Sequence, residues 1–158
     1  FDFLKKKDKE IEIGAPVKGK AVPISQVSDP TFGEEILGKG VAIQPEDGKI
    51  YAPADGTIEM LFDTKHAVSM TTTEGVELLV HIGLDTVALK GEHFTAHKGN
   101  GIGEKGDLLI SVDLEAVKAA GYDVITPMVV CNTSDYQTVE AVTGSDVNPG
   151  DTVLILKK

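Results

Sequence analysis

The chain has 158 residues, of which 41% are hydrophobic, and its formal net charge at pH 7 is −10. This length suits one domain with a substantial core, and the negative charge argues against nucleic acid as a partner. The charge favours a basic protein surface as partner, or serves solubility alone. One cysteine, Cys131, cannot form an internal disulfide, and no apolar run approaches the roughly 20 residues of a membrane span. We therefore expect a cytoplasmic protein.

Residues 1–10 form a polar segment that begins with the large apolar residues Phe1, Phe3 and Leu4. We expect a flexible N-terminal tail here and a single domain over residues 11–158. The apolar start followed by lysines also fits a short amphipathic helix at a membrane surface, which would bind weakly at this length. We expect no secretory signal.

Short segments that are apolar, or alternate between apolar and polar residues, follow one another along the chain, separated by Gly and Pro. They predict strands at residues 11–13, 19–24, 41–43, 56–62, 65–70, 76–82, 108–112, 128–131, 138–142 and 152–156. Many short strands at such intervals are typical of all-β folds. We expect an all-β, flattened antiparallel sandwich or barrel of the barrel-sandwich hybrid type, with Cys131 buried as a small hydrophobic residue.

Two short helical turns interrupt these strands. Asp29 can cap a helix whose first residue is Pro30, and Gly38 can end it. Asp113 and Gly121 bracket a second helix in the same way. Neither segment is long enough to change the all-β class.

Two pairs of segments repeat weakly along the chain. Residues 15–19 (Ala-Pro-Val-Lys-Gly) echo residues 52–56 (Ala-Pro-Ala-Asp-Gly), and residues 105–107 (Lys-Gly-Asp) echo residues 149–151 (Pro-Gly-Asp). The repetition predicts two related hairpin units that fold against each other.

The most informative stretch, residues 62–90, predicts a β-hairpin with a polar turn. A turn that is symmetric about the Thr73–Glu74 bond places His66 directly opposite His81. Their Cβ atoms would then lie about 4.5–5.5 Å apart. A bulge in the turn would shift the register by one residue and break this pairing.

Two imidazoles in contact hold two positive charges poorly, so at least one should stay neutral near pH 7. A neutral ring nitrogen is a nucleophile, and a neighbouring ring N–H can donate to an arriving anion. The hydroxyl of Thr64 can bridge to His66, and Asp85 can attract a basic partner. This chemistry fits transient capture of a phosphoryl group by His81. The alternative is a metal site, because two neutral imidazoles need only a carboxylate and a water to hold Zn²⁺.

These residues resemble the enzyme IIA component of the glucose class in the bacterial sugar phosphotransferase system. The similar segments cover nearly the whole chain: residues 23–32, 35–43, 51–56, 64–67, 75–87 and 89–92, followed by Gly106-Asp107, Thr126-Pro127 and Asn132. The two histidine motifs are the specific part of this resemblance.

The resemblance implies a role for each of these residues. His81 matches the histidine that accepts a phosphoryl group from the carrier protein HPr and donates it to a cysteine on the IIB domain of a glucose-type permease. His66 matches a second histidine that orients the phosphoryl group, and Thr64 matches the hydroxyl that hydrogen-bonds that ring. No soluble cofactor is required for this function.

The resemblance also implies a partner-binding surface of apolar residues ringed by acids. The apolar positions are Phe32, Ile36, Leu37, Val41, Phe62, Leu79 and Val87, and the acidic ones are Asp29 and Asp85. For Phe32 and Phe62, ordinary core packing is the alternative. Some members of the family also bind other permeases and glycerol kinase, the latter with Zn²⁺ bridging the positions of His66 and His81.

One region departs from the family. Residues 92–103 contain His93, His97 and extra glycines, and we expect a variable surface loop there. A metal role for this histidine pair is the alternative, because the two residues are four apart. Whether the chain is free-standing or part of a larger permease, and which sugar it serves, stay open.

Two other classes of protein compete with this interpretation. A zinc hydrolase of the lysostaphin-like endopeptidase type would need a third protein ligand and a His-x-His pair, which this chain lacks. A lipoyl-type carrier would need a lysine at an exposed hairpin tip. Lys65 adjoins His66 within a predicted strand and does not suit that role.

Overall fold

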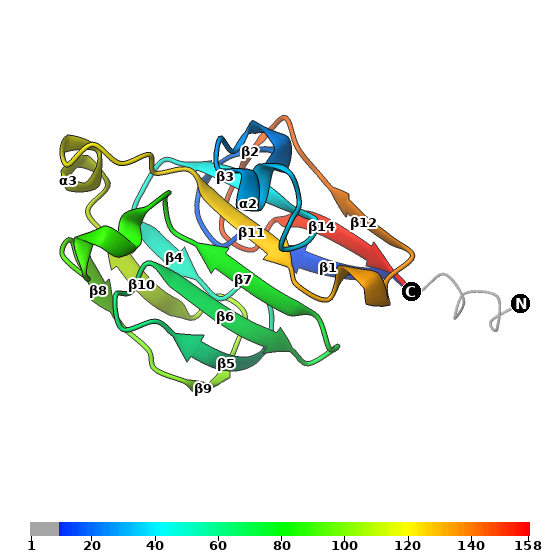
Figure 1. Cartoon of the computed structure of the whole chain (residues 1–158). Helices are drawn as coiled ribbons and strands as arrows, with labels where there is room; N and C mark the ends of the chain where they lie inside the picture. The colour runs from blue at the N-terminus through cyan, green and yellow to red at the C-terminus, as the bar shows by residue number, and fades with distance from the viewer. Residues whose placement is uncertain (1–9) are drawn as a thin grey trace, which may run out of the picture.

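The computed structural model describes residues 10–158 as antiparallel sheets with a few short helices (Figure 1). The strands are β1 (Glu10–Gly14), β2 (Gly19–Pro23), β3 (Gly40–Pro45), β4 (Lys49–Tyr51), β5 (Gly56–Leu61), β6 (Ala67–Thr72), β7 (Glu77–His81), β8 (Phe94–Ala96), β9 (Gly101–Gly103), β10 (Leu108–Val112), β11 (Thr126–Val130), β12 (Thr138–Ala141), β13 (Asp146–Val147) and β14 (Thr152–Lys157). The helices are η1 (Ile24–Gln26), α2 (Pro30–Gly33), η2 (Thr86–Leu89), α3 (Leu114–Ala119) and η3 (Thr133–Asp135).

Three sheets enclose one main core. The largest has the order β13-β2-β3-β11-β7-β6-β5-β9, and the other two have the orders β1-β14-β12 and β4-β10-β8. Side chains from all three meet in the interior, among them Ile13, Ile43, Leu78, Ile110 and Leu154. Burying each such side chain contributes about 1.5–3 kcal/mol. The predicted all-β sandwich is confirmed, and the largest sheet stays open because its end strands, β13 and β9, do not pair.

The predicted strands coincide with observed ones, although their ends shift by one or two residues. The sequence did not reveal β4, β8, β9 and β13, which are too short to show a periodic pattern. The burial of Cys131 was predicted wrongly. This residue follows the last residue of β11 and is exposed.

The N-terminal segment is described only from Glu10 onward. Glu10, which the sequence places in the tail, is instead the first residue of β1 and lies opposite Lys157 of β14. The predicted tail and its membrane-surface alternative otherwise concern residues 1–9, which lie outside the described part of the chain.

Both predicted helix caps are present. The carboxylate of Asp29 accepts a hydrogen bond from the backbone N–H of Thr31 at 3.0 Å, and that of Asp113 accepts one from Ala116 at 3.1 Å. Gly38 does not end the first helix. Helix α2 stops at Gly33, shortly before Glu35 enters a left-handed conformation with φ of 59°.

The internal repetition is visible in the backbone hydrogen bonds. Gly14 N–H donates to Pro53 at 3.0 Å, and the equivalent Tyr51 N–H donates to Pro16 at 2.7 Å. Gly106 N–H donates to Ala52, as Gly150 N–H donates to Ala15, both at 3.0 Å. The two copies therefore lie against each other in matching arrangements, as the sequence predicted.

The β6–β7 hairpin forms with a register one residue away from the predicted one. Ala67, and not His66, lies opposite His81. The turn is a three-residue loop, closed by a 2.9 Å hydrogen bond from Thr72 N–H to Val76 and including Gly75 with φ of 93°. The predicted alternation of β7 is correct, because Val76, Leu78, Val80 and Ile82 are all buried.

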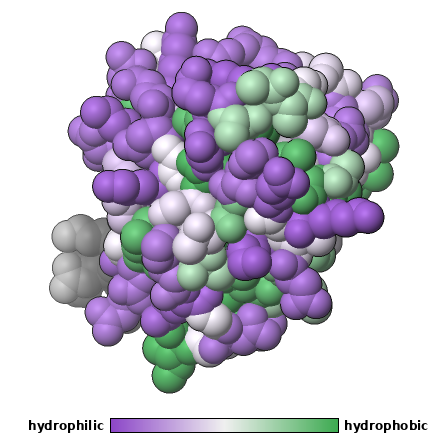
Figure 2. Space-filling view, turned by 90° about the vertical axis from the view of Figure 1, so that its left-hand side faces the viewer, coloured by the Kyte–Doolittle hydropathy of each residue, from purple (hydrophilic) through white to green (hydrophobic). Residues whose placement is uncertain are grey.

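No helix within residues 10–158 is long and apolar enough to span a membrane. The face of the molecule shown in Figure 2 is mainly hydrophilic, with hydrophobic side chains in small separate groups. This distribution agrees with the charge of −10 calculated from the sequence.

Two glycines of the repeat allow strands to approach closely, which yields a stability prediction. A Cβ atom added at Gly19 would collide with the carbonyl oxygen of Gln44, and one added at Gly56 with that of Thr71. We expect Gly19→Ala and Gly56→Ala each to lower the free energy of unfolding by about 1–3 kcal/mol. Urea denaturation followed by circular dichroism measures this.

The matched control is Gly99→Ala, where an added Cβ atom meets nothing within 4 Å. We expect its effect to stay within about 0.5 kcal/mol. If all three substitutions have equal effects, close backbone approach is not the reason for glycine at the repeated positions.

Candidate functional site

Two histidine rings lie side by side at one end of the β6–β7 hairpin. The ring centroids of His66 and His81 are 5.0 Å apart, and the ring planes meet at 76°. His81 is the last residue of β7, whereas His66 directly precedes β6. Backbone pairing continues past the strand ends, because Ile82 N–H donates to the carbonyl of His66 at 2.7 Å. The predicted contact of the rings therefore exists despite the shifted register.

The hydrogen bonding of His81 determines which ring nitrogen can react. Its Nδ1 lies 2.6 Å from the carbonyl oxygen of Gly83, which can only accept a hydrogen bond. Nδ1 therefore carries the proton in the neutral ring. The lone pair is left on Nε2, which makes that atom the nucleophile.

His66 is held by the turn that joins β5 to β6. Its Nδ1 is hydrogen-bonded to the hydroxyl of Thr64, and the ring of Phe62 lies edge-on at a centroid distance of 5.4 Å. Nε2 is therefore the ring nitrogen that remains for other contacts. Thr64 and Lys65 both lie in this turn. Lys65 was predicted to begin a strand, but it has φ of 59° and precedes β6.

The surroundings of both rings favour the neutral imidazole. Burial lowers the pKa of His66 below the ordinary value of 6.5, and the charge of protonated His81 lowers it further. Burial also lowers the pKa of His81, although its hydrogen bond to Gly83 and the carboxylates of Asp29 and Asp85 oppose part of that effect. Neutral rings can both act as nucleophiles and donate hydrogen bonds near pH 7.

Helix α2 supports His81 from the other side. The ring of Phe32 lies 5.0 Å from that of His81, and it belongs to a second apolar cluster that includes Ile24, Leu84 and Val129. Phe32 is only 4% exposed, so it packs in this cluster and does not offer an open contact surface. Core packing, the alternative considered from the sequence, describes its position.

The other residues expected at a partner surface fall into three groups. Ile36, Leu37, Val87 and Asp85 are exposed; Asp29, Phe62 and Leu79 are half-buried; Val41 is fully buried in the main core. The prediction of Val41 at this surface is therefore wrong. Strand β3 is covered on both faces here, because Val41 packs in the main core and the adjacent Ala42 packs in the second apolar cluster. A short apolar run does not show that both faces are buried.

Sequence reasoning missed Met60, which is 49% exposed. Met60 lines a hollow of about 600 Å³ together with Phe62, His66 and Val87. Regular alternation along the predicted strand 56–62 puts Met60 on the same face as Ile58, which is buried. The sequence therefore contains no sign that Met60 is exposed.

His93 and His97 do not join this pair of rings. Nε2 of His97 lies 2.7 Å from the hydroxyl of Ser111, and His93 faces the carboxylate of Glu92 at 3.7 Å. Among residues 10–158, no three His, Cys, Asp or Glu side chains gather in a cluster suited to a metal ion.

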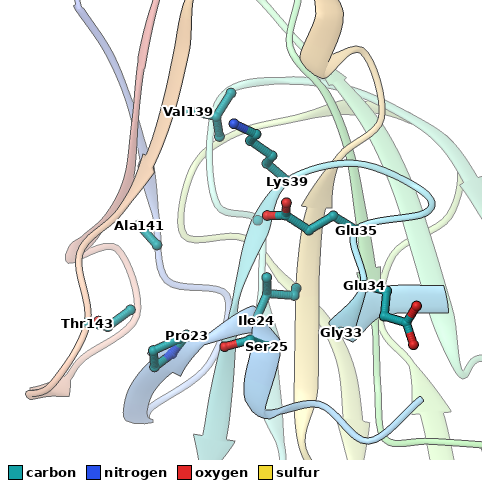
Figure 3. A pocket seen from close by; sticks show the side chains of 11 residues that line it. Pro23, Ile24, Ser25, Gly33, Glu34, Glu35, Lys39, Val139, Ala141 and Thr143 are labelled. Atoms are coloured by element: carbon teal, nitrogen blue, oxygen red, sulfur yellow. The ribbon is translucent and has the colours of Figure 1, made fainter. Parts of the chain in front are cut away.

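A second hollow, of about 510 Å³, is lined in part by Gly33 at the end of helix α2 (Figure 3). Val139, Ala141 and Thr143 line one side of it, and Pro23, Ile24 and Ser25 line another. Neither His66 nor His81 lines this space. His81 is half-buried and His66 is buried beside it, and both rings lie away from the hollow shown in Figure 3.

The chain is similar to known proteins over most of its length. Residues 11–136 match the family model for the phosphoenolpyruvate-dependent sugar phosphotransferase system, EIIA 1. The chain is 42% identical to a glucose-specific EIIA component of Haemophilus influenzae, over 100% of this chain and 96% of the relative. Glucose permease IIA of Mycoplasma capricolum has a similar structure, with a TM-score of 0.88 and 37% identity over 95% of this chain and 97% of that chain.

Other relatives are much longer than this chain. A beta-glucoside-specific EIIBCA component of Bacillus subtilis is 45% identical over 91% of this chain, which spans only 24% of that relative. These similarities favour the interpretation drawn from the histidine motifs over a zinc hydrolase or a lipoyl carrier. The chain belongs to the EIIA 1 family of the phosphoenolpyruvate-dependent sugar phosphotransferase system.

Proposed function

We propose that this chain is a phosphocarrier in which Nε2 of His81 receives a phosphoryl group from phospho-HPr and passes it to a cysteine on the IIB domain of a glucose-type permease. The observation that carries the proposal is the hydrogen bond from Nδ1 of His81 to Gly83. It leaves the lone pair on Nε2, on a half-buried ring at the surface. A transfer between two proteins needs such an accessible atom.

The transfer is a direct exchange of one nitrogen–phosphorus bond for another. The bond from phosphorus to the histidine of phospho-HPr breaks as the bond to Nε2 of His81 forms. Nδ1 of His81 keeps its proton, so the phosphorylated ring remains hydrogen-bonded to Gly83. In the second transfer the thiolate of the IIB cysteine attacks phosphorus, and the electron pair of the broken bond returns to Nε2.

His66 stabilises the phosphoryl group without keeping it. When the Thr64 hydroxyl donates to Nδ1 of His66, Nε2 of that ring carries the proton. The ring contact of 5.0 Å brings this donor beside the phosphoryl oxygens on His81. A positioned donor of this kind stabilises charge that develops during transfer.

The surroundings of the rings suit docking of a basic partner. Ile36, Leu37 and Val87 are exposed apolar side chains, and Asp85 adds negative charge near His81. Apolar residues next to a reactive group become stable contacts when a partner covers them. Half-buried Phe62 and Leu79 extend this surface, with Asp29 at its edge.

The proposed transfers require no cofactor. Zn²⁺ can bind His66 and His81 only where a partner supplies a further ligand, as at an interface with glycerol kinase. We propose this regulatory contact as secondary to phosphoryl transfer.

The first prediction concerns the division of roles between the two rings. After incubation with phosphoenolpyruvate, enzyme I and HPr, acid-labile phosphate should map to His81. His81→Gln should accept none. His66→Gln should accept phosphate but pass it to IIB about 10²- to 10³-fold more slowly, because it lacks the donor. Peptide mapping and single-turnover transfer assays measure these outcomes.

The matched control is His97→Gln, which removes a ring that contacts Ser111 and not the histidine pair. We expect phosphate uptake and transfer by this variant to equal those of the wild type. Phosphate recovered on His66 of the wild type would contradict the proposed roles.

The second prediction concerns the protonation of the pair, since Nε2 of His81 is a nucleophile only in the neutral ring. Titration of labelled histidines by NMR should give midpoints below 6.5 for both residues. In His81→Gln the midpoint of His66 should rise, because the charge of His81 no longer opposes protonation. It should stay below 6.5, since burial is the larger cause.

The same shifts determine how stability depends on pH. Below pH 6.5 the unfolded chain binds protons at these histidines more readily than the folded chain, so the pair destabilises the fold as pH falls. This contribution is absent above the unfolded pKa. In the NMR titration, a His66 midpoint that is the same in His81→Gln as in the wild type would show that protonated His81 does not lower the pKa of His66.

A further inference from the structure

Strand β5 contains a bulge just before the histidine turn. Ile58 lies opposite Met70 of β6, but Met60 lies opposite Ser69, so the register shifts between Ile58 and Met60. Regular alternation would turn Met60 to the same side as Ile58, which is 1% exposed. Instead Met60 is 49% exposed, and Leu61 packs against the main core. The bulge therefore moves Met60 from the interior to the surface.

Asn100 holds the strand in this conformation. Pairing between β9 and β5 ends where Gly101 lies opposite Ile58, so the N–H of Leu61 lies beyond the last paired residue. The side-chain oxygen of Asn100 accepts a hydrogen bond from that N–H at 2.9 Å. A polar side chain thus replaces the missing strand partner at the point where the bulge ends.

The exposed Met60 forms one wall of the hollow beside His66. Phe62 and Val87 line the same space, and Val87 is 50% exposed. Large apolar side chains left half exposed next to a reactive ring indicate a contact that forms in a complex. Asp63, which is exposed, lies on the rim, and Asp85 lies two residues from Val87.

We propose that Met60 is a docking residue for phospho-HPr: the hollow that it lines receives an apolar side chain of that partner, and Asp63 and Asp85 face basic residues beside that side chain. The apolar walls fit the side chain, and the two carboxylates fit its basic neighbours. A methionine suits this position, because its flexible thioether adapts to differently shaped surfaces. This inference rests on the proposed phosphocarrier function.

The test is steady-state phosphorylation of the whole chain by phospho-HPr. Met60→Ala should raise KM for phospho-HPr about five- to tenfold, because truncating a buried docking residue costs more than about 1 kcal/mol of binding free energy. The kcat value should remain within about twofold, since His81 is not among the residues that line the hollow with Met60. Met60→Lys should raise KM further, because a charged group would occupy the apolar hollow.

The matched control is Ile102→Ala on the neighbouring strand β9. Ile102 is 82% exposed but does not line the hollow, so its removal should leave KM unchanged. Urea denaturation of each variant establishes that it is folded under the assay conditions.

Asn100 also lines the hollow, and its variants test whether its hydrogen bond to the Leu61 N–H, and with it the bulge, matters for docking. Asn100→Ala should raise KM as Met60→Ala does, because the Leu61 N–H loses its acceptor. Asn100→Asp keeps an acceptor oxygen and should restore KM. A merely structural role would change the unfolding midpoint in Asn100→Ala without this selective change in KM.

Three results would overturn the inference: an unchanged KM in folded Met60→Ala, an equal rise in Ile102→Ala, or a defect confined to transfer to IIB. In each case the wild type would still be phosphorylated on His81, so the proposed function would stand. A wild type that takes no phosphate from phospho-HPr would instead refute the proposed function, and this inference with it.

Discussion

The hydrogen bond between Nδ1 of His81 and the carbonyl of Gly83 decides which atom of the site can react. Gly83 adopts a left-handed conformation with φ of 75°, which few other residues tolerate. The hydrogen bond from His81 to Gly83, two residues further along the chain, thereby holds the imidazole ring in place. Phe32 on α2 and His66 before β6 then limit its orientation from two further elements. All the chemistry proposed for the site depends on this one fixed proton.

Irregular backbone, and not regular pairing, assembles the surroundings of that ring. The hairpin register places Ala67 opposite His81, so His66 contacts its partner from just outside the strand. Lys65 in the left-handed region shapes the turn that holds Thr64 and His66 together. The bulge in β5 turns Met60 outward on the same side. The large sheet provides a rigid base, and the turns at its end provide the reactive and exposed groups.

The two histidine rings carry little positive charge near pH 7, and the ring of His81 is only half-buried. Burial keeps both imidazoles neutral to lower pH than free histidine, which preserves the lone pair of His81 and the N–H of His66. The carboxylates of Asp29 and Asp85 moderate that shift for His81 and add negative charge to the surface. The negative net charge and the exposed apolar residues therefore favour the same kind of partner, a protein whose docking surface carries both basic and apolar side chains.

The all-β class, the two helix caps, the internal repeat and the grouping of His66 and His81 with Thr64 could all be predicted from the amino-acid sequence, because each follows from local periodicity or from a motif. The hairpin register could not be predicted, since one residue in a turn changes it. Likewise, only the structure placed Val41 in the core, Cys131 at the surface and Met60 beside His66. Burial depends on which strands pack above a residue and on bulges, and neither leaves a periodic signal in a short strand.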